Sequence, residues 1–402
     1  MGGAVLAALV LGAVLFVAFG ETFWLRWLLE SPSAGRCQTR LSRPVLTRSI
    51  ELATRFLLAH QKPEGNFDYE YDWRRRTLSA DDHETRQAGA LWGLTLAYAD
   101  DPRPELSRAI ERGLTYFDQH SRLINGMRCT VYPGSAVGHA GTVALVALSH
   151  IEYLGAAHAL PSERRMQWES RSAEYLKMLL RSQAPDGRWL NDYELSRCEP
   201  GGESSSYSDG EALLALVKAA KYQGRADLWP IIMSAAASGK RLNIDEALAK
   251  DGDSDVTKGY YQWSTMAFYE LATSGLPDTA HFGDYVLEQS DWEIDVHQTL
   301  TRQRNTGYAY EGLIPAYDWA RRRGDTARTA KYGCVIDLAL ERLISWQVGG
   351  PLSTRYTSAV EPNDTEAIGG VQNERNEPAL RIDVTQHQTH ALIYARDFIY
   401  TK

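Results

Sequence analysis

The sequence predicts an all-α fold, an (α/α)6 toroid in which outer and inner helices alternate around a ring. Amphipathic segments follow one another along the 402 residues, with no convincing strand-rich section between them. Segments with one polar face alternate with segments that are apolar nearly all round, and the apolar kind occurs six times. The pairs recur at roughly 50 to 75 residues without an evident polar cap at either end, which favours a closed ring over an open array.

The chain opens with an apolar segment that we expect to be a membrane anchor or an uncleaved signal. Nearly all side chains from Ala4 to Phe19 are apolar, which is just enough to span a hydrocarbon core. Trp24 and Trp27 follow, at the place of a membrane interface. Ala18 and Gly20 fit the small-x-small pattern of a cleavage site, so removal of the segment stays open.

This pattern predicts three regions: an anchor or signal in residues 1–30, a linker in 31–44 and the toroid in 45–402. The arginines follow the apolar segment, so the positive-inside rule taken literally keeps the toroid in the cytoplasm. A short apolar segment before one large body is most often a secretion device. We therefore expect a membrane-anchored protein with a periplasmic or extracellular body, and the cytoplasmic face is the alternative.

The outer helices of the predicted ring carry a polar stripe that faces solvent. Their segments are residues 42–61, 104–120, 161–183, 227–250, 279–289 and 326–347. The inner helices are rich in alanine, glycine and leucine, because small residues let buried helices approach closely. Their segments are residues 83–99, 138–155, 208–222, 260–272, 307–320 and 384–400.

The four cysteines leave the compartment open. Cys129 and Cys198 fall in loops that precede neighbouring inner helices, so a disulfide between them is possible and would favour export. Cys334 lies in an apolar helical pattern, where we expect a buried free thiol. Cys37 lies in the polar segment after the anchor, and no spacing typical of a structural zinc site is present.

Composition excludes one class of partner and suggests another. With 51 acidic residues against 43 Lys and Arg, the chain has no basic footprint for a nucleic acid. It has 11 Trp and 21 Tyr against 9 Phe, and these rings combine an apolar face with a polar handle. Such surfaces suit sugar rings, although the same residues also close helix interfaces.

The ends of three outer helices resemble the Gln-x-x-x-Gly-x-aromatic ends of toroid enzymes such as glucuronyl C5-epimerases, six-hairpin glycosidases and triterpene cyclases. They read FLLAHQKPEGNFDYEY, LLRSQAPDGRWLNDY and, more degenerately, LISWQVGGPLSTRY. The openings YSDGEALLALVKAA and TGYAYEGLIPAYDWA, and the C-terminal RIDVTQHQTHALIY, are similar to the epimerase and six-hairpin glycosidase group. Triterpene cyclases fit poorly because their acidic catalytic segment is missing. The resemblance implies a carbohydrate-active toroid.

In a closed ring the inner helices are parallel, so their N-termini converge on one mouth, where polar residues concentrate. Carboxylates, histidines and Tyr or Trp around one depression are the composition of a sugar site with acid and base groups. The candidate catalytic residues are Asp82, Asp209, Glu211 and Glu311. The candidate substrate-binding residues are Glu84, Arg86, His139, Tyr207, Tyr260, Trp263, Tyr308, Tyr310, Arg381, His387 and His390.

The carboxylates divide into expected bases and an expected acid. Helix N-termini favour ionised carboxylates, which suits a base or nucleophile better than a proton donor. We expect Glu311 to be the donor, because an apolar pocket that includes Tyr310 would raise the pKa of its carboxyl. His387 is expected to position the substrate. Asp209 and Glu311 should face each other obliquely across the mouth.

Several of these residues have a structural alternative. Ser208-x-x-Glu211 is a capping box and Ser79-x-x-Asp82 resembles one, so both acids could only satisfy helix N–H groups. His387 and His390 have a spacing that permits a shared metal. Because no HExxH context accompanies them, we expect hydrogen-bonded site histidines and predict no metal or cofactor.

Three arginines near the predicted mouth bear on the substrate. Arg86, Arg304 and Arg381 would pair the carboxylate of a uronate, and the alternative is that they pair with neighbouring acids. The sequence thus predicts a carbohydrate-active enzyme of the cell envelope that acts on a polysaccharide by glycoside hydrolysis or by uronate epimerisation or elimination. The alternative is a non-catalytic toroid that binds a glycan or a partner in a membrane-associated polysaccharide biosynthesis complex.

Overall fold

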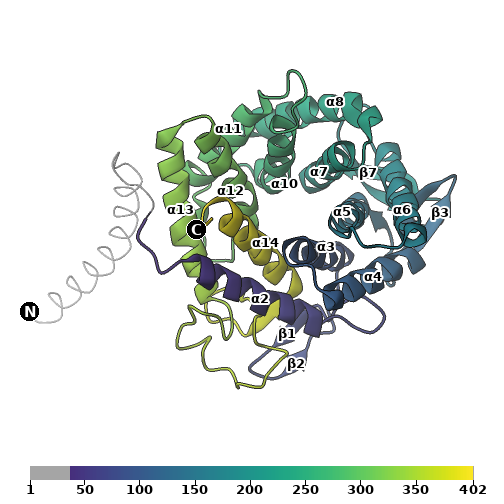
Figure 1. The fold of residues 1–402 in the computed structure, drawn as a ribbon. Coiled ribbons are helices and arrows are strands. Elements are labelled where there is room, and N and C mark those ends of the chain that lie inside the picture. The colour runs from purple at the N-terminus through teal and green to yellow at the C-terminus, as the bar shows by residue number, and fades with distance from the viewer. Residues whose placement is uncertain (1–36, 402) are drawn as a thin grey trace, which may run out of the picture.

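Six helices form a closed inner ring within residues 37–401, the part of the chain that this computed structural model describes. Each inner helix contacts the next around the ring, and the last contacts the first (Figure 1). This confirms the predicted toroid and the order of its helices. The inner helices are α3 (Glu84–Asp100), α5 (Ala140–Ala156), α7 (Ser206–Tyr222), α10 (Asp255–Ala272), α12 (Gly307–Arg322) and α14 (Ile382–Phe398).

The outer helices surround this ring in chain order (Figure 1). The fourth outer segment is not one regular α-helix. Helix α8 is followed by the π-helix η2 (Lys240–Asp245) and then by the short α9 (Glu246–Lys250). The fifth outer helix extends to Asp295, beyond the predicted segment 279–289. The outer helices are α2 (Arg43–Ala59), α4 (Pro104–Gln119), α6 (Ser162–Arg181), α8 (Trp229–Gly239), α11 (Phe282–Asp295) and α13 (Thr326–Ser345), with short 3-10 helices η1 (Ala226–Leu228) and η3 (Thr299–Thr301) in the connections.

Glycines set the close approach of neighbouring inner helices. A methyl group at Gly93 of α3 would overlap the side chain of Gln386 on α14. A methyl group at Gly210 of α7 would meet the Cβ of Trp263 on α10 at 2.5 Å. The small residues of the inner helices are therefore required by packing, and they fix how the helix N-termini are arranged at the mouth.

Short strands, which were not predicted from the sequence, line the mouth. They occur in the connections from an outer helix to the N-terminus of the next inner helix, so they lie at that end of the ring. Each is only two to six residues long, too short for an alternating pattern to be recognised. The sheets have the orders β2 (Thr77–Leu78)–β1 (Glu70–Asp72)–β8 (Ala379–Arg381), β3 (Ser121–Ile124)–β4 (Met127–Thr130), and β5 (Gly138–His139)–β6 (Leu190–Glu194)–β7 (Glu199–Ser204), all antiparallel.

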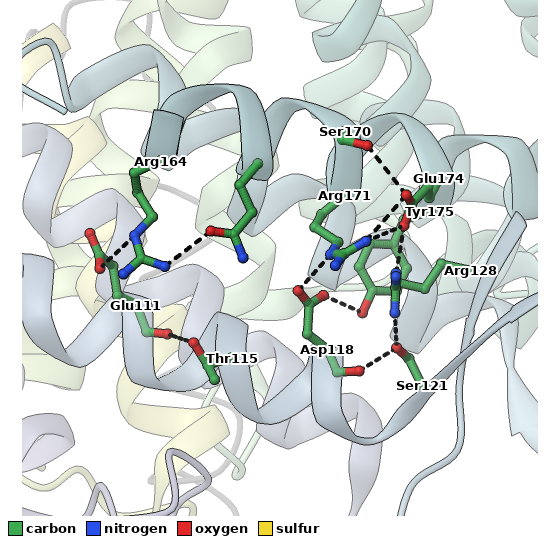
Figure 2. Close-up of polar contacts among 11 residues, drawn as sticks. Glu111, Thr115, Asp118, Ser121, Arg128, Arg164, Ser170, Arg171, Glu174 and Tyr175 are labelled. Atoms are coloured by element: carbon green, nitrogen blue, oxygen red, sulfur yellow. Dashed lines mark hydrogen bonds and ion pairs between the residues drawn. The ribbon is translucent and has the colours of Figure 1, made fainter. Parts of the chain in front are cut away.

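Ion pairs join α4, α6 and the β3–β4 hairpin on the outer wall (Figure 2). Arg171 of α6 donates to Asp118 of α4 at 2.9 Å, and Arg128 of β4 donates to Glu174 of α6 at 2.7 Å. Arg128 also donates to the hydroxyl of Ser121 at the start of β3. The hairpin that leads into α5 is thereby fixed against two outer helices.

Two disulfides tie loops to the helical frame. Cys129 at β4 is bonded to Cys198 in the β6–β7 turn, as the sequence allowed. The expectation of a free thiol at Cys334 is wrong, because Cys334 of α13 is bonded to Cys37 with the two Cα atoms 4.6 Å apart. The segment before α2 runs along α13, a proximity between positions 297 residues apart that periodicity cannot reveal.

Removing the second of these bonds should lower the stability of the toroid. The Cys37→Ser/Cys334→Ser variant should lose about 2–5 kcal/mol of unfolding free energy, because the bond constrains a very long loop of the unfolded chain. Denaturant unfolding of the variant and the oxidised parent measures the difference. Equal midpoints, with the parent shown by mass spectrometry to be oxidised at both positions, would contradict the expectation.

The membrane expectation concerns residues that the structure does not cover. No helix between residues 37 and 401 is long and apolar enough to cross a membrane. The predicted anchor or signal in residues 1–30 lies outside the described residues, as does the first part of the predicted linker. Helix α2 begins at Arg43, where Ser42 caps it by accepting a hydrogen bond from the Val45 N–H.

Candidate active site at the mouth of the toroid

The N-termini of the inner helices carry two groups of titratable side chains. One group lies on α10, α12 and α14, and the other lies on α3, on α7, on strand β5 directly before α5, and on strand β6. In the observed ring order, α5 stands opposite α12 and α7 stands opposite α14. The two groups therefore face each other across the mouth.

Glu311 of α12 is the centre of the first group. Its carboxylate is completely buried and faces His387 Nδ1 at 2.9 Å and His390 Nδ1 at 3.5 Å. Gln262 Nε2 donates a hydrogen bond to the same carboxylate. Burial acts to raise the pKa of Glu311, but the two histidines outweigh it and hold this pKa below its ordinary value. Glu311 is therefore ionised at neutral pH.

His387 of α14 is the member of this group that reaches the mouth. Its side chain is 24% exposed, and its Nε2 has no hydrogen-bond partner within residues 37–401. Burial acts to lower the pKa of His387, and the neighbouring Glu311 carboxylate more than offsets it and raises this pKa. With Nδ1 held by Glu311, Nε2 is the atom that can meet a ligand.

This geometry reverses two expected roles. Glu311 was expected to be a proton donor with a raised pKa, and that expectation is wrong because two histidines and an amide surround it instead of an apolar pocket. His387 was expected to position the substrate. The structure instead gives Glu311 the orienting position and His387 the accessible one.

Two indole rings pack against the histidines of this group. Trp92 of α3 packs edge-on against His390 at 4.9 Å between ring centroids, and it lies 5.6 Å from Trp263. Trp263 in turn lies 6.3 Å from His387. Trp92 was not among the predicted site residues, because a tryptophan within an apolar helix is indistinguishable from core.

Glu84 and His139 form the centre of the second group. Glu84, the first residue of α3, faces His139 Nε2 at 3.4 Å and accepts from the Ser135 hydroxyl at 3.3 Å. Burial raises the pKa of Glu84 to about 7. The other nitrogen of His139 lies 2.8 Å from Asp192 of β6. Asp192 was missed because it lies in a connection for which no strand was predicted.

Glu211 of α7 is a buried carboxyl with no hydrogen bond or ion pair to any residue between 37 and 401. Burial raises its pKa to about 8, so it is neutral at pH 7. Its Oε2 lies against Gly141 of α5, where a methyl group would overlap it. The capping-box alternative is not realised, since α7 begins at Ser206 and Ser208 lies inside the helix.

Asp209 is held by structural contacts. Its oxygens accept from the Trp189 backbone N–H at 2.7 Å and from Asn243 Nδ2 at 2.8 Å, while burial raises its pKa to about 6. Gln87 makes the equivalent bond to the backbone of Phe67, two hairpin pairs earlier in the ring. Both residues thus anchor the Gln-x-x-x-Gly-x-aromatic ends, and we place the acid–base chemistry on other residues.

Asp82 is a connecting residue at the rim. It accepts hydrogen bonds from Gln87 Nε2 at 2.7 Å and from the Tyr132 hydroxyl at 2.6 Å. It also accepts from the backbone N–H of His83, the residue before α3. These bonds fix Asp82 in place, so its surroundings fit the structural alternative better than the role of a free base.

The arginines are paired with neighbouring acids. Arg86 lies 3.3 Å from Asp383, and Arg381 donates to the other oxygen of Asp383 at 3.0 Å. Arg304 donates to Glu374 at 2.9 Å. The structure therefore favours the alternative of internal ion pairs over three free cations that await a uronate.

The predicted aromatic residues divide by exposure. Tyr207 is 51% exposed at the rim and lies against Gly259 of α10, so it can stack on a ligand. Tyr260 and Tyr310 are buried, and the hydroxyl of Tyr260 lies against Gly239 of the outer α8. Their expected contact with a substrate is wrong, since both point into the packing of the rings. Tyr308 is partly buried.

The chain was compared with known proteins. No protein-family model and no curated protein sequence matches it. Solved structures match along almost the whole chain at low identity, and this likeness shows that the toroid fold is shared. They include a D-mannose isomerase (TM-score 0.61, 13% identity, 90% of this chain and 100% of that one), a sugar epimerase from a ruminal bacterium (0.62, 12%, 88% and 98%) and the cellobiose 2-epimerase of Spirochaeta thermophila (0.58, 13%, 89% and 96%).

Proposed function

We propose that this chain is a carbohydrate-active enzyme that moves protons between the two sides of the mouth. One observation carries the proposal: the surroundings of carboxyl groups at the same mouth shift their pKa values in opposite directions. Histidines hold the pKa of Glu311 low, whereas burial raises the pKa of Glu84 to about 7 and that of Glu211 to about 8. Environments that separate the pKa values of site carboxyls mark an acid and a base.

The residues take distinct roles in this proposal. His387 contacts the substrate through Nε2 and accepts the proton, while Glu311 orients the imidazole and raises its pKa. Glu84 and Glu211 are the proton donors on the facing side. Hydrolysis of a glycosidic bond and a proton shift at a sugar carbon both need one donor and one acceptor on opposite sides of the ligand. The sugar isomerase and epimerases that share the fold support a carbohydrate as the ligand.

The second candidate is a non-catalytic toroid that binds a glycan or a partner. The burial of Glu84, Glu211 and Glu311, each at most 5% exposed, favours it, because a buried carboxyl group offers a ligand little surface to contact. Binding of an unaltered glycan by the full chain, without turnover, would support this candidate.

Isotope labelling separates the reactions. The full chain is incubated with a panel of neutral and acidic oligosaccharides, once in H2(18)O and once in D2O. Hydrolysis places (18)O at the new reducing end, and epimerisation or isomerisation places deuterium on a sugar carbon. His387→Ala should bind the converted sugar but incorporate neither label. Label incorporation at the parent rate by His387→Ala would overturn the proposed chemistry.

The contact between Glu211 and Gly141 gives a matched pair of variants. Gly141→Ala should lower turnover about tenfold or more, because the added methyl displaces the Glu211 carboxyl. Gly155→Ala lies on the same helix with no atom within 4 Å of the added methyl, so turnover should stay unchanged and stability should rise by up to about 1 kcal/mol. Steady-state rates and melting temperatures test both, and equal turnover in the two variants would exclude Glu211 from the chemistry.

We also propose that the body lies on the exported side of a membrane, held there by the apolar segment of residues 1–30. The disulfides Cys37–Cys334 and Cys129–Cys198 support this proposal, since such bonds persist in oxidising compartments. Thiol alkylation of the full chain inside intact cells, followed by mass spectrometry, tests it. Alkylation of all four cysteines in untreated cells would overturn it.

A further inference from the structure

We propose that Asp192 and His139 form a proton relay that connects solvent to the carboxyl group of Glu84. The inference rests on the proposed function, because Glu84 needs a relay only if it gives up and regains a proton in each turnover. It adds to that function a path and a residue, Asp192, that lies outside the inner helices.

The three side chains form one line across three elements. His139, in β5 immediately before α5, stands in the middle, with Nδ1 2.8 Å from Asp192 Oδ1 and Nε2 3.4 Å from Glu84 Oε1. Each ring nitrogen therefore faces one carboxylate. An imidazole that can hold a proton on either nitrogen is the side chain best suited to link two carboxyl groups.

Exposure rises along this line. The side chain of Glu84 is 3% exposed, that of His139 is 32% and that of Asp192 is 36%. Glu84 Oε2 is buried and has no hydrogen-bond partner among the described residues, while Oε1 faces the imidazole. A carboxyl group so enclosed exchanges protons with solvent slowly unless a more exposed group carries them.

The backbone fixes the outer end of the line. His139 and Asp192 are paired in register across β5 and β6, so their side chains lie on the same side of the sheet. Asn191 Nδ2 donates to Asp192 Oδ1 at 2.6 Å, and the Ser208 hydroxyl donates to Asn191 at 2.7 Å. Gly202 of β7, at φ +77°, passes Asp192 so closely that a Cβ would lie 3.1 Å from its Oδ2.

Other titratable groups near His139 do not compete for its nitrogens. His83 precedes α3, and its pKa is lowered by burial and then by the charges of Arg86 and His139. Glu211 lies against Gly141, two residues after His139. Neither His83 nor Glu211 makes a hydrogen bond to His139 among residues 37–401, so Glu84 and Asp192 are the two carboxyl groups that its nitrogens face.

The proton step is balanced and needs no reactant other than an acid from solution. After Glu84 has given its proton to the sugar, the His139 imidazolium transfers the proton on Nε2 to Glu84 Oε1. The Nδ1 proton stays hydrogen-bonded to Asp192, whose negative charge stabilises the imidazolium. A hydronium ion or buffer acid in solution then restores the proton on the partly exposed ring.

The test uses the full chain and a sugar that it converts. Asp192→Asn should lower kcat at least about tenfold in dilute buffer with KM unchanged, less than the loss of an acid–base group itself. Added imidazole buffer should restore most of the rate, because a diffusible acid replaces the relay. Glu203→Gln, an exposed carboxylate change on the neighbouring β7, should behave as the parent at every buffer concentration. An Asp192→Asn rate equal to the parent's, or a slow rate that buffer does not restore, would overturn the relay.

A second measurement does not need turnover. The nitrogen chemical shifts of the His139 ring, followed by NMR in the full chain, should change at Nδ1 in Asp192→Asn and at Nε2 in Glu84→Gln, since each variant replaces the carboxyl group that faces that nitrogen. Ring shifts that stay unchanged in both variants would refute the relay even if the enzyme is active. Absence of turnover on every sugar with both changes present would refute the proposed function and leave the contacts of His139 intact.

Discussion

Replacing Glu311 by glutamine should reduce turnover at least about a hundredfold while the toroid stays folded. The variant keeps the shape of the side chain and removes the charge that raises the pKa of His387. Burial then outweighs the remaining charge of Asp383, so the pKa of His387 falls and its imidazole becomes a weaker proton acceptor. Steady-state kinetics gives the loss of rate, and an NMR titration of His387 gives the fall of its pKa.

Asp209→Asn is the matched comparison, because it also exchanges a buried carboxylate for an amide at the mouth. Its oxygens bind Trp189 and Asn243, so the exchange should cost about 1–3 kcal/mol of stability and leave the turnover of the folded fraction nearly unchanged. A Glu311→Gln enzyme with parental turnover and a lowered His387 pKa would exclude the pair from catalysis. A hundredfold loss in Asp209→Asn at unchanged melting temperature would return Asp209 to the catalytic set.

Stability should fall as pH rises from about 4.5 to about 8. Burial raises the pKa of Glu211 and of Glu293, a fully buried residue of α11, to about 8 in the folded chain. The unfolded chain releases these protons near pH 4.3. Their stabilising contribution is therefore complete below that pH and is lost as the pH rises to the folded pKa, at about 5 kcal/mol for each group. Groups with lowered pKa values, such as Glu311 and Asp383, lose their contribution only in more acidic solution.

Thermal unfolding at pH 5 and at pH 8.5 tests this dependence, and the melting temperature should be higher at pH 5. Glu293→Gln should flatten the curve and raise stability at pH 8.5, because neither carboxylate oxygen of Glu293 has a hydrogen-bond partner in the described chain. Glu288→Gln, an exposed change on the same helix, should leave the pH dependence as it is in the parent. Parallel curves of melting temperature against pH for the parent and Glu293→Gln would show that this carboxyl is not the source of the pH dependence.

The fold was predictable because each ring imposes its own pattern on the sequence. Outer helices show a polar stripe and inner helices do not, so alternation along the chain predicts alternation in space. The strands escaped prediction because β1 and β5 have only three and two residues, and each pairs with a strand of another connection, β1 with β8 and β5 with β6. Such pairings depend on the closed ring and not on local sequence.

The position of the site was predictable, and the roles within it were not. Convergence of helix N-termini places Glu311, His387 and Glu84 at one mouth. The lowered pKa of Glu311 depends on His387, which lies 76 residues further along the chain. The two side chains meet in space because of how α12 and α14 cross. Asp192 and Gln262 can be recognised as site residues only in the folded chain, where they contact His139 and Glu311.

The bond between Cys37 and Cys334 determines which part of the chain carries a mechanical load. A pull applied between the segment before Cys37 and the C-terminus passes through the sulfur atoms directly into α13. Helix α2, the strands β1 to β7 and the inner helices from α3 to α12 lie between the two cysteines in sequence, so they are outside the path of the force. Only α13 after Cys334, the connection that follows and α14 are stretched. Tension on the N-terminal segment therefore leaves Glu84, His139 and Glu311 under no direct strain as long as the bond is intact.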